Sequence, residues 1–161
     1  YNELAQLCSL DSKTVEKYVI LLEQSYVIFR LNSFSRNLRN ELKTSKKIYF
    51  YDNGIRNALI ANFNQIEGRA DRGALWENFL ISERKKFLEY NRLWGNSWFW
   101  RTKEQKEIDL VEERDGKITG YEFKWNPDQK VKIPRLFLDS YENSDFQVIH
   151  RDNCDSFLLE Y

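Results

Sequence analysis

The sequence predicts a mixed α/β (α+β) protein in which a small helical segment and a hairpin precede a mixed sheet flanked by helices. Two observations carry this prediction. Apolar residues recur every three to four positions near the start and the middle of the chain, and short β-rich runs separated by turn signals follow each helical stretch. The 161 residues are 42 % hydrophobic and 16 % aromatic, which is enough to fill one core or two small ones.

The first elements have a helix-turn-helix pattern. After a short helical stretch and a turn near residues 8–10, Asp11 or Ser12 can cap a second helix, whose apolar stripe includes Val15 and Val19. The β-rich runs that follow bracket a polar, basic segment and cover residues 26–31 and 47–51. Two helices followed by a hairpin predict a winged helix, which we expect over residues 1–70.

The second part begins after turn signals and a short helical pattern over residues 55–62. An amphipathic helix is expected from Ala74 to Tyr90. The strands and helix expected after it cover residues 98–101, 108–113, 118–125, 128–141 (a helix, which Pro134 limits) and 146–150. This order predicts a mixed sheet flanked by helices over residues 71–161.

Four residues of this second part form a chemical pattern. Glu77 lies on the expected helix, Asp109 on the middle strand, and Glu122 and Lys124 on the next strand. Because strand side chains alternate, Glu122 and Lys124 share one face, and a hairpin through residues 115–116 brings Asp109 beside it. Order and spacing resemble the PD-(D/E)XK nuclease superfamily, which implies a restriction-endonuclease-like fold with these four residues as its active site.

The pattern suits phosphodiester hydrolysis. Asp109 and Glu122 offer hard oxygen ligands to Mg²⁺ or Mn²⁺, which would supply hydroxide near neutral pH and a counter-charge for the transition state. Lys124 would orient the attacking water and neutralise the phosphate, and Glu77 would support the site through a water of the cation or by ordering Lys124. A lone Glu-x-Lys on a strand is otherwise typical of a solvated face with a weak salt bridge.

The whole chain resembles the C-terminal region of a prokaryotic group of AAA-type ATPases, in which a winged helix precedes a nuclease-like domain of unknown function. The segments that carry the resemblance are residues 26–30, 48–54, 73–78 and 121–124, and Asp109 matches as well. The resemblance implies an upstream ATPase module in the same chain. No phosphate-binding loop of the form G-x-x-x-x-G-K-[ST] occurs here, so we expect no ATP binding by these residues.

Nucleic acid is the expected partner, with DNA favoured. Residues 1–70 hold 10 Lys/Arg against 7 Asp/Glu, and residues 71–161 hold 15 against 18, so basic charge gathers in the first part. The side chains expected to touch phosphates are Lys13, Lys17, Arg36, Arg39, Lys43, Lys46 and Lys47. The alternative is that this winged helix is a packing element attached to the ATPase.

Other residues are expected to be structural. Glu104, Glu107, Glu112 and Glu113 are expected to face solvent, although Glu107 could replace an active-site acid in a shifted register. His150 is expected to be structural. Cys8 and Cys154 predict neither a disulfide framework nor a zinc site. With no signal peptide and no membrane span in the sequence, we expect a cytoplasmic protein.

The sequence leaves the activity open between three functions. The first is a Mg²⁺-dependent nuclease, and the second is a non-catalytic module that uses the nuclease fold to bind nucleic acid or protein for the ATPase. The third is a specificity subunit resembling transcription regulators.

Overall fold

The computed structural model describes residues 1–36 and 45–159. In chain order the elements are α1 (Asn2–Cys8), α2 (Ser12–Gln24), β1 (Ile28–Asn32), β2 (Lys46–Phe50), α3 (Asn53–Leu59), the 3-10 turn η1 (Ile66–Gly68), α4 (Arg72–Tyr90), β3 (Asn96–Arg101), β4 (Glu107–Arg114), β5 (Lys117–Phe123), α5 (Arg135–Ser140), β6 (Ser144–Ile149) and α6 (Cys154–Leu159). Helices and strands both contribute to the layers, which confirms the predicted α+β class.

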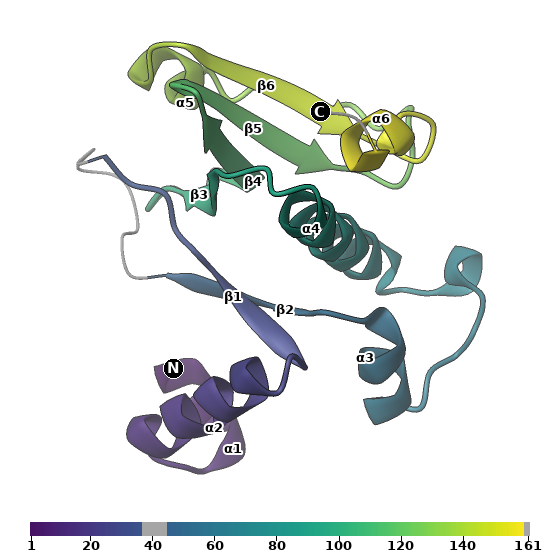
Figure 1. The fold of residues 1–161 in the computed structure, drawn as a ribbon. Helices are drawn as coiled ribbons and strands as arrows, with labels where there is room; N and C mark the ends of the chain where they lie inside the picture. Colours follow the sequence, from purple (N-terminus) through teal and green to yellow (C-terminus); the bar gives the residue numbers. More distant parts are fainter. Residues whose placement is uncertain (37–44, 160–161) are drawn as a thin grey trace.

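Two sheets organise the chain. The larger one has the strand order β3-β4-β5-β6, with β5 and β6 parallel and the other neighbours antiparallel. The parallel pair requires a crossover, and α5 lies in it. The smaller sheet is the antiparallel hairpin β1-β2. It lies on the α4 side of the large sheet, and α1 and α2 lie beyond it (Figure 1).

Each face of the large sheet has its own hydrophobic core. Trp76 and Leu80 of α4 pack with Phe99, Tyr121 and other residues of one face, and α6 adds Phe157 to this cluster. On the other face, Phe137 of α5 packs with Trp100, Ile108, Val111 and Ile118. Burial on both faces explains why adjacent strand residues, such as Phe99 and Trp100, are both buried and apolar.

The hairpin belongs to the same core as the large sheet. Phe29, Leu31 and Tyr49 of β1 and β2 lie in the α4-side cluster. Just after β1, the Phe34 N–H donates to the carbonyl of Phe99 in β3 at 2.6 Å. The hydrophobic core is therefore continuous across the predicted boundary near residue 70.

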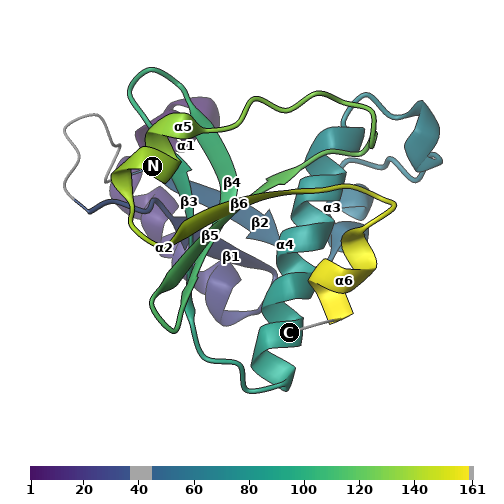
Figure 2. The ribbon, with the colours of Figure 1, turned by 90° about the horizontal axis from the view of Figure 1, so that it is seen from above.

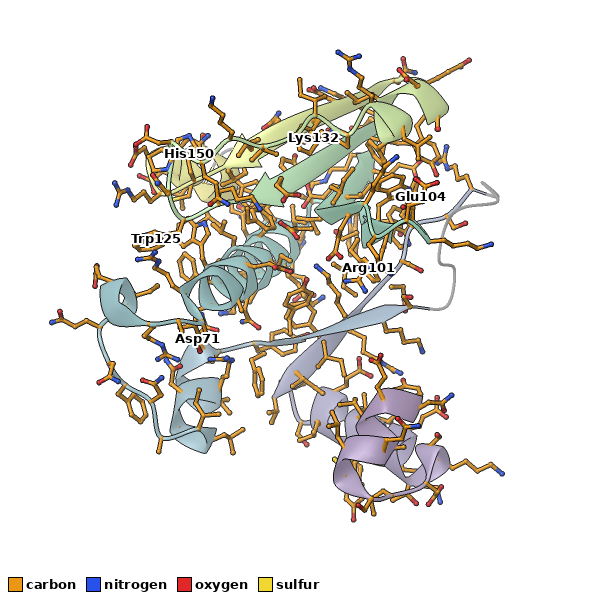
Figure 3. All side chains as sticks on the ribbon, turned by 180° about the vertical axis from the view of Figure 1, so that it is seen from behind. Asp71, Arg101, Glu104, Trp125, Lys132 and His150 are labelled. Carbon is orange, nitrogen blue, oxygen red and sulfur yellow. The ribbon has the colours of Figure 1, made fainter. Side chains whose placement is uncertain are left out.

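A second link across this boundary is polar. Asp71, which precedes α4, accepts hydrogen bonds from Arg56 at 2.7 Å and from Arg69 at 2.9 Å. Asp71 lies beside α3 at the start of α4 (Figure 3). These bonds hold the beginning of α4 against α3, and α4 is the helix that carries Glu77.

One predicted element is wrong in extent. A helix was expected over residues 128–141, but the structure has only α5, Arg135–Ser140. Pro134 occupies the N-cap position, and its ring and missing N–H prevent the helix from extending back through it. Residues 124–134 instead form an irregular connection that runs from the end of β5 across to α5 (Figure 2).

At the other end of the chain, α1 and α2 precede the hairpin in the predicted order. Val15 and Val19 pack with Ala5 and Ile28 in a third small cluster. The assignment of this segment as a winged helix stays a prediction. Within residues 1–36 and 45–159, no helix has both the length and the apolar character needed to cross a membrane.

Candidate active site

Asp109 owes its position to an irregularity in β4. Trp98 pairs with Val111 and Trp100 with Ile108, so one more residue lies between the pairs on β4 than on β3. An extra residue of this kind re-aims side chains. Ile108 and Val111 therefore face the α5 side, whereas Leu110 joins the α4-side core and Asp109 reaches the hairpin.

Asp109 also marks the place where β4 and β5 separate. The last residue pair between these strands is Leu110 with Tyr121. Beyond this pair, the Phe123 N–H donates to Oδ2 of Asp109 at 3.0 Å. This hydrogen bond fixes the buried carboxylate at the place where the two strands separate.

Glu122 and Lys124 take the alternating positions that the sequence predicted. Phe123, between them, is buried in the α4-side core, and the two charged side chains point the other way. Lys124 Nζ lies 2.6 Å from Oε1 of Glu122. The side chains of the pair are 24 % and 18 % exposed, so both groups remain accessible from solvent.

A lysine from the hairpin enters this group of acids. Lys47 Nζ lies 2.9 Å from Oε1 of Glu77 and 3.5 Å from Oδ1 of Asp109, and it forms an ion pair with Glu107. Its side chain is 17 % exposed. We call Glu77, Glu107, Asp109, Glu122 and the ammonium groups of Lys47 and Lys124 the acidic cluster. It draws residues from β2, α4, β4 and β5.

Helix α4 positions both Glu77 and the strand that carries Lys47. Oε1 of Glu77 accepts a hydrogen bond from the Tyr49 hydroxyl at 2.7 Å. The next residue, Asn78, bonds both backbone groups of Phe50, accepting from its N–H at 2.8 Å and donating to its carbonyl at 2.9 Å. Because Asn78 is buried, these bonds hold β2 in register with α4.

Crowding of the carboxylates changes their protonation. Burial, together with the carboxylates of Glu77 and Glu122, raises the pKa of Asp109 to about 7. Burial opposes the charge on Lys47, but Glu77, Asp109 and Glu107 outweigh it and raise the pKa of Lys47 to about 12. For Lys124, burial is likewise outweighed, chiefly by Glu122, and its pKa is raised. Both lysines are therefore cationic at neutral pH.

The cluster keeps an excess of negative charge. Four carboxylates face three cations. Two of the cations are Lys47 and Lys124, and the third is Arg101, which pairs with Glu107 at 2.6 Å. Arg101 lies on the side of the sheet that faces β2 (Figure 3). The donor atoms are carboxylate oxygens, the type that Mg²⁺ and Mn²⁺ prefer.

These donors fit a hydrated divalent cation better than a fully protein-coordinated one. Within the described parts of the chain, no three His, Cys, Asp or Glu side chains are arranged as a set of metal ligands. Mg²⁺ commonly uses only one or two carboxylates and completes its shell with waters and substrate phosphates. Asp109 and Glu122 would be those two ligands, with Glu77 behind Asp109.

The raised pKa of Asp109 gives a pH-dependent stability prediction. The folded protein binds this proton more tightly than the unfolded chain, in which the pKa is near 3.8. The cost of ionising Asp109 is thus absent below about pH 4, grows as the pH rises, and is complete above about pH 7. Asp109→Asn, which keeps an acceptor for the Phe123 N–H, should raise the free energy of unfolding by about 2 kcal/mol at pH 8 in EDTA.

Urea unfolding of both proteins between pH 4 and pH 8 measures this effect. The stability gain of Asp109→Asn should shrink toward zero at the acid end. A constant difference across the range would mean that Asp109 ionises in the folded protein as it does in the unfolded chain.

The seven basic residues expected to bind nucleic acid do not form one surface. Lys13 and Lys17 are exposed on α2, and Lys46 lies 5.1 Å from the centre of the Tyr1 ring. Arg36 is ion-paired with Glu113. Arg39 and Lys43 lie outside the described residues. Lys47 is held by the carboxylates of the acidic cluster rather than on an open wing.

Two of the expectations for acidic residues change. Glu112 was expected to face solvent, which is wrong: it is 4 % exposed and binds the buried Arg84 at 3.1 Å. The irregularity in β4 places Leu110 and Glu112 on the α4 side, where Arg84 lies. Glu107 is half-buried and belongs to the acidic cluster. Glu104 is exposed, and Glu113 is half-buried against Arg36.

Lys47 belongs to the site, although the sequence predicted it only as a contact to nucleic acid. The signal was available, because Lys47 and Tyr49 share one face of β2, and that face is buried against α4. His150 is half-buried, and its backbone N–H donates to Asn153. Cys8 and Cys154 are free thiols.

Comparison with known proteins finds families whose functions are not established. Residues 72–154 match the model described as Domain of unknown function (DUF4143), and residues 1–66 match Domain of unknown function (DUF8612). Uncharacterized proteins of Mycobacterium bovis and Mycobacterium tuberculosis are each 29 % identical over 124 residues, which is 76 % of this chain and 27 % of theirs. The chain thus spans about a quarter of the length of these relatives. No solved structure matches.

Proposed function

The chain belongs to the family described as Domain of unknown function (DUF4143), and we propose that it is a Mg²⁺- or Mn²⁺-dependent nuclease domain. The observation that carries the proposal is that the Glu122–Lys124 pair lies near enough to Asp109 for their charges to interact, at the end of the sheet where β4 and β5 separate. This is the arrangement implied by the resemblance to the PD-(D/E)XK superfamily. Asp109 and Glu122 would hold the cation.

In this proposal the chain's own residues have separate tasks. A divalent cation supplies positive charge for the phosphoryl transition state and makes hydroxide available near neutral pH. Lys124, which is cationic at neutral pH, cannot accept a proton. It would therefore donate hydrogen bonds to the scissile phosphate or to the attacking water. Glu77 would keep Asp109 in place through their shared contact with Lys47.

Lys47 also supports a second candidate function. Its ammonium already forms ion pairs with three carboxylates of the acidic cluster, a position that a bound cation could otherwise take. In a non-catalytic module this ion-pair network would be purely structural, and the nuclease fold would serve for binding nucleic acid or protein. The two candidates differ in whether a divalent cation binds at all.

A cleavage assay tests the nuclease. The 161-residue chain is incubated with labelled single-stranded and double-stranded DNA and RNA in Mg²⁺, Mn²⁺ or EDTA. Cleavage of any of these that requires the cation and disappears in Asp109→Asn supports the proposal. Intact substrates in every condition, also when the full-length relative is used, would favour the binding module.

We also propose that this domain works within a longer cytoplasmic protein that contains an ATPase module. The support is the resemblance to the C-terminal region of AAA-type ATPases, together with the short share of its relatives that the chain spans. In such a protein, α1, α2 and the hairpin would form a winged helix between the ATPase and the nuclease-like sheet.

A further inference from the structure

A cleft of about 990 Å³ adjoins the acidic cluster on the α5 side of the large sheet. Glu107, Glu122 and Lys124 line it. Residues 129–134 of the irregular connection between β5 and α5 also line it, together with Arg135 at the start of α5. The cleft therefore leads from the candidate active site along a segment that no family description or sequence motif assigns to a function.

The wall of the cleft is strongly basic. Lys130, Lys132 and Arg135 all line it and are all exposed. Within residues 1–36 and 45–159, no ion pair involves any of these three side chains, in contrast to Lys47 and Lys124. Lys132 lies on the outer side of the sheet, away from α4 (Figure 3). Three uncompensated cations within six residues form a local site for a polyanion.

The floor of the cleft is apolar. Leu136 and Phe146, both half-buried, contribute apolar surface to its lining, over the fully buried Trp100. An acidic peptide would gain little from such a floor, whereas nucleotides carry both phosphates and flat apolar bases. A basic groove beside apolar and aromatic side chains is the usual arrangement for binding single strands without sequence preference.

The size of the cleft favours one strand over two. Its volume is near the upper end of the range for small-ligand pockets, about 300–1,000 Å³. A few nucleotides of an extended strand fit a cleft of this kind, while a duplex would have to remain outside it. The three basic residues lie within six consecutive positions and line the same cleft.

We infer that this cleft binds a single strand of nucleic acid, with Lys130, Lys132 and Arg135 contacting successive phosphates and leading the strand to Glu122 and Lys124. The direction of the strand toward these residues rests on the proposed nuclease function. The binding itself does not, so the two can be tested separately.

Binding is measured by fluorescence anisotropy with labelled single-stranded DNA and RNA in EDTA, where no cleavage takes place. The test variant is Lys130→Glu/Lys132→Glu/Arg135→Glu, and the control is Arg92→Glu/Lys117→Glu, two exposed basic residues that do not line the cleft. At about 0.1 M salt the triple variant should bind on the order of 100-fold more weakly. The titration is repeated at several salt concentrations with Lys130→Gln/Lys132→Gln/Arg135→Gln. In this variant the fall of log K with log salt should be less steep by about two.

The control should bind like the wild type, and a competing duplex should displace the strand poorly. The inference is overturned if the triple variants retain wild-type affinity, if the control variant loses binding instead, or if the wild type binds no single strand. Preferred binding of duplex would also overturn it. Thermal unfolding of each variant verifies that these exposed substitutions leave the fold intact.

Mn²⁺ binding and cleavage by the wild type are recorded separately. Strand binding that depends on the cleft without cleavage would uphold this inference and remove the nuclease proposal. Cleavage by the wild type together with unchanged binding by the triple variants would uphold the nuclease proposal and overturn this inference.

Discussion

Replacing Lys47 by methionine should lower the free energy of unfolding by about 3 kcal/mol at pH 8 in EDTA. Methionine keeps most of the volume of the side chain but removes the charge that three carboxylates share. Removing one partner from an ion-pair network with little solvent exposure leaves the remaining charges desolvated and repelling one another. Urea unfolding measures the loss, and Lys46→Met provides the control, because Lys46 is exposed and its ammonium lies beside Tyr1, outside the acidic cluster.

The same variant tests the link between Lys47 and the cation. In the wild type, the ammonium of Lys47 and a divalent cation would compete for the same carboxylates. Lys47→Met should therefore gain more stability from Mn²⁺ than the wild type does, because a cation that binds only the folded state stabilises it by mass action. Equal responses of the two proteins to Mn²⁺ would show that the cation, if it binds, does so away from Lys47.

The second large effect is expected in catalysis. Lys124→Met should reduce cleavage by about 10²–10³-fold, since it removes a preorganised positive charge from the position where the phosphoryl charge develops. Folding should change little, because Lys124 pairs with a single carboxylate at a partly exposed position. Single-turnover cleavage rates at saturating Mn²⁺ give the measurement.

A matched control exists on the same strand. Lys117, at the beginning of β5, is exposed and paired with Asp145 at 3.3 Å. Lys117→Met should leave the cleavage rate unchanged. A comparable loss in both variants would indicate a general effect of charge on substrate binding and would contradict the assigned role of Lys124.

The periodicity of the sequence predicted the elements well because each lies against a core. The long helix α4 was expected from Ala74 to Tyr90 and extends over Arg72–Tyr90, and the three consecutive strands lie within two residues of their expected bounds. Phe99 and Trp100 are both fully buried. The short helix α6 was missed, since six residues carry too little periodic signal.

The acidic cluster was predicted in part. Alternation along β5 placed Glu122 and Lys124 on one face, and the structure agrees. The position of Asp109 depends on an irregular register in β4, which no local pattern announces. Lys47 reaches the cluster only because the hairpin packs against α4, a contact between segments 30 residues apart. Such long-range packing is decided by the whole core rather than by neighbouring residues.

The basic cleft was hidden for a related reason. In a helix over residues 128–141, as the sequence predicts, Lys130 and Lys132 would point to different faces. Because Pro134 delays the helix until Arg135, the preceding residues follow the edge of the cleft instead. The surface that we assign to nucleic acid thus arises from a break in regular structure.

Binding of a divalent cation by Asp109 and Glu122 can be measured by calorimetric titration of Mn²⁺. Mn²⁺ is titrated into the wild type, Asp109→Asn and Asp115→Asn, the last being a control at the exposed turn between β4 and β5. We expect one site per chain in the wild type and in the turn variant, and at least a tenfold loss of affinity in Asp109→Asn. Equal binding by all three proteins, or no binding by the wild type at millimolar Mn²⁺, would contradict this expectation.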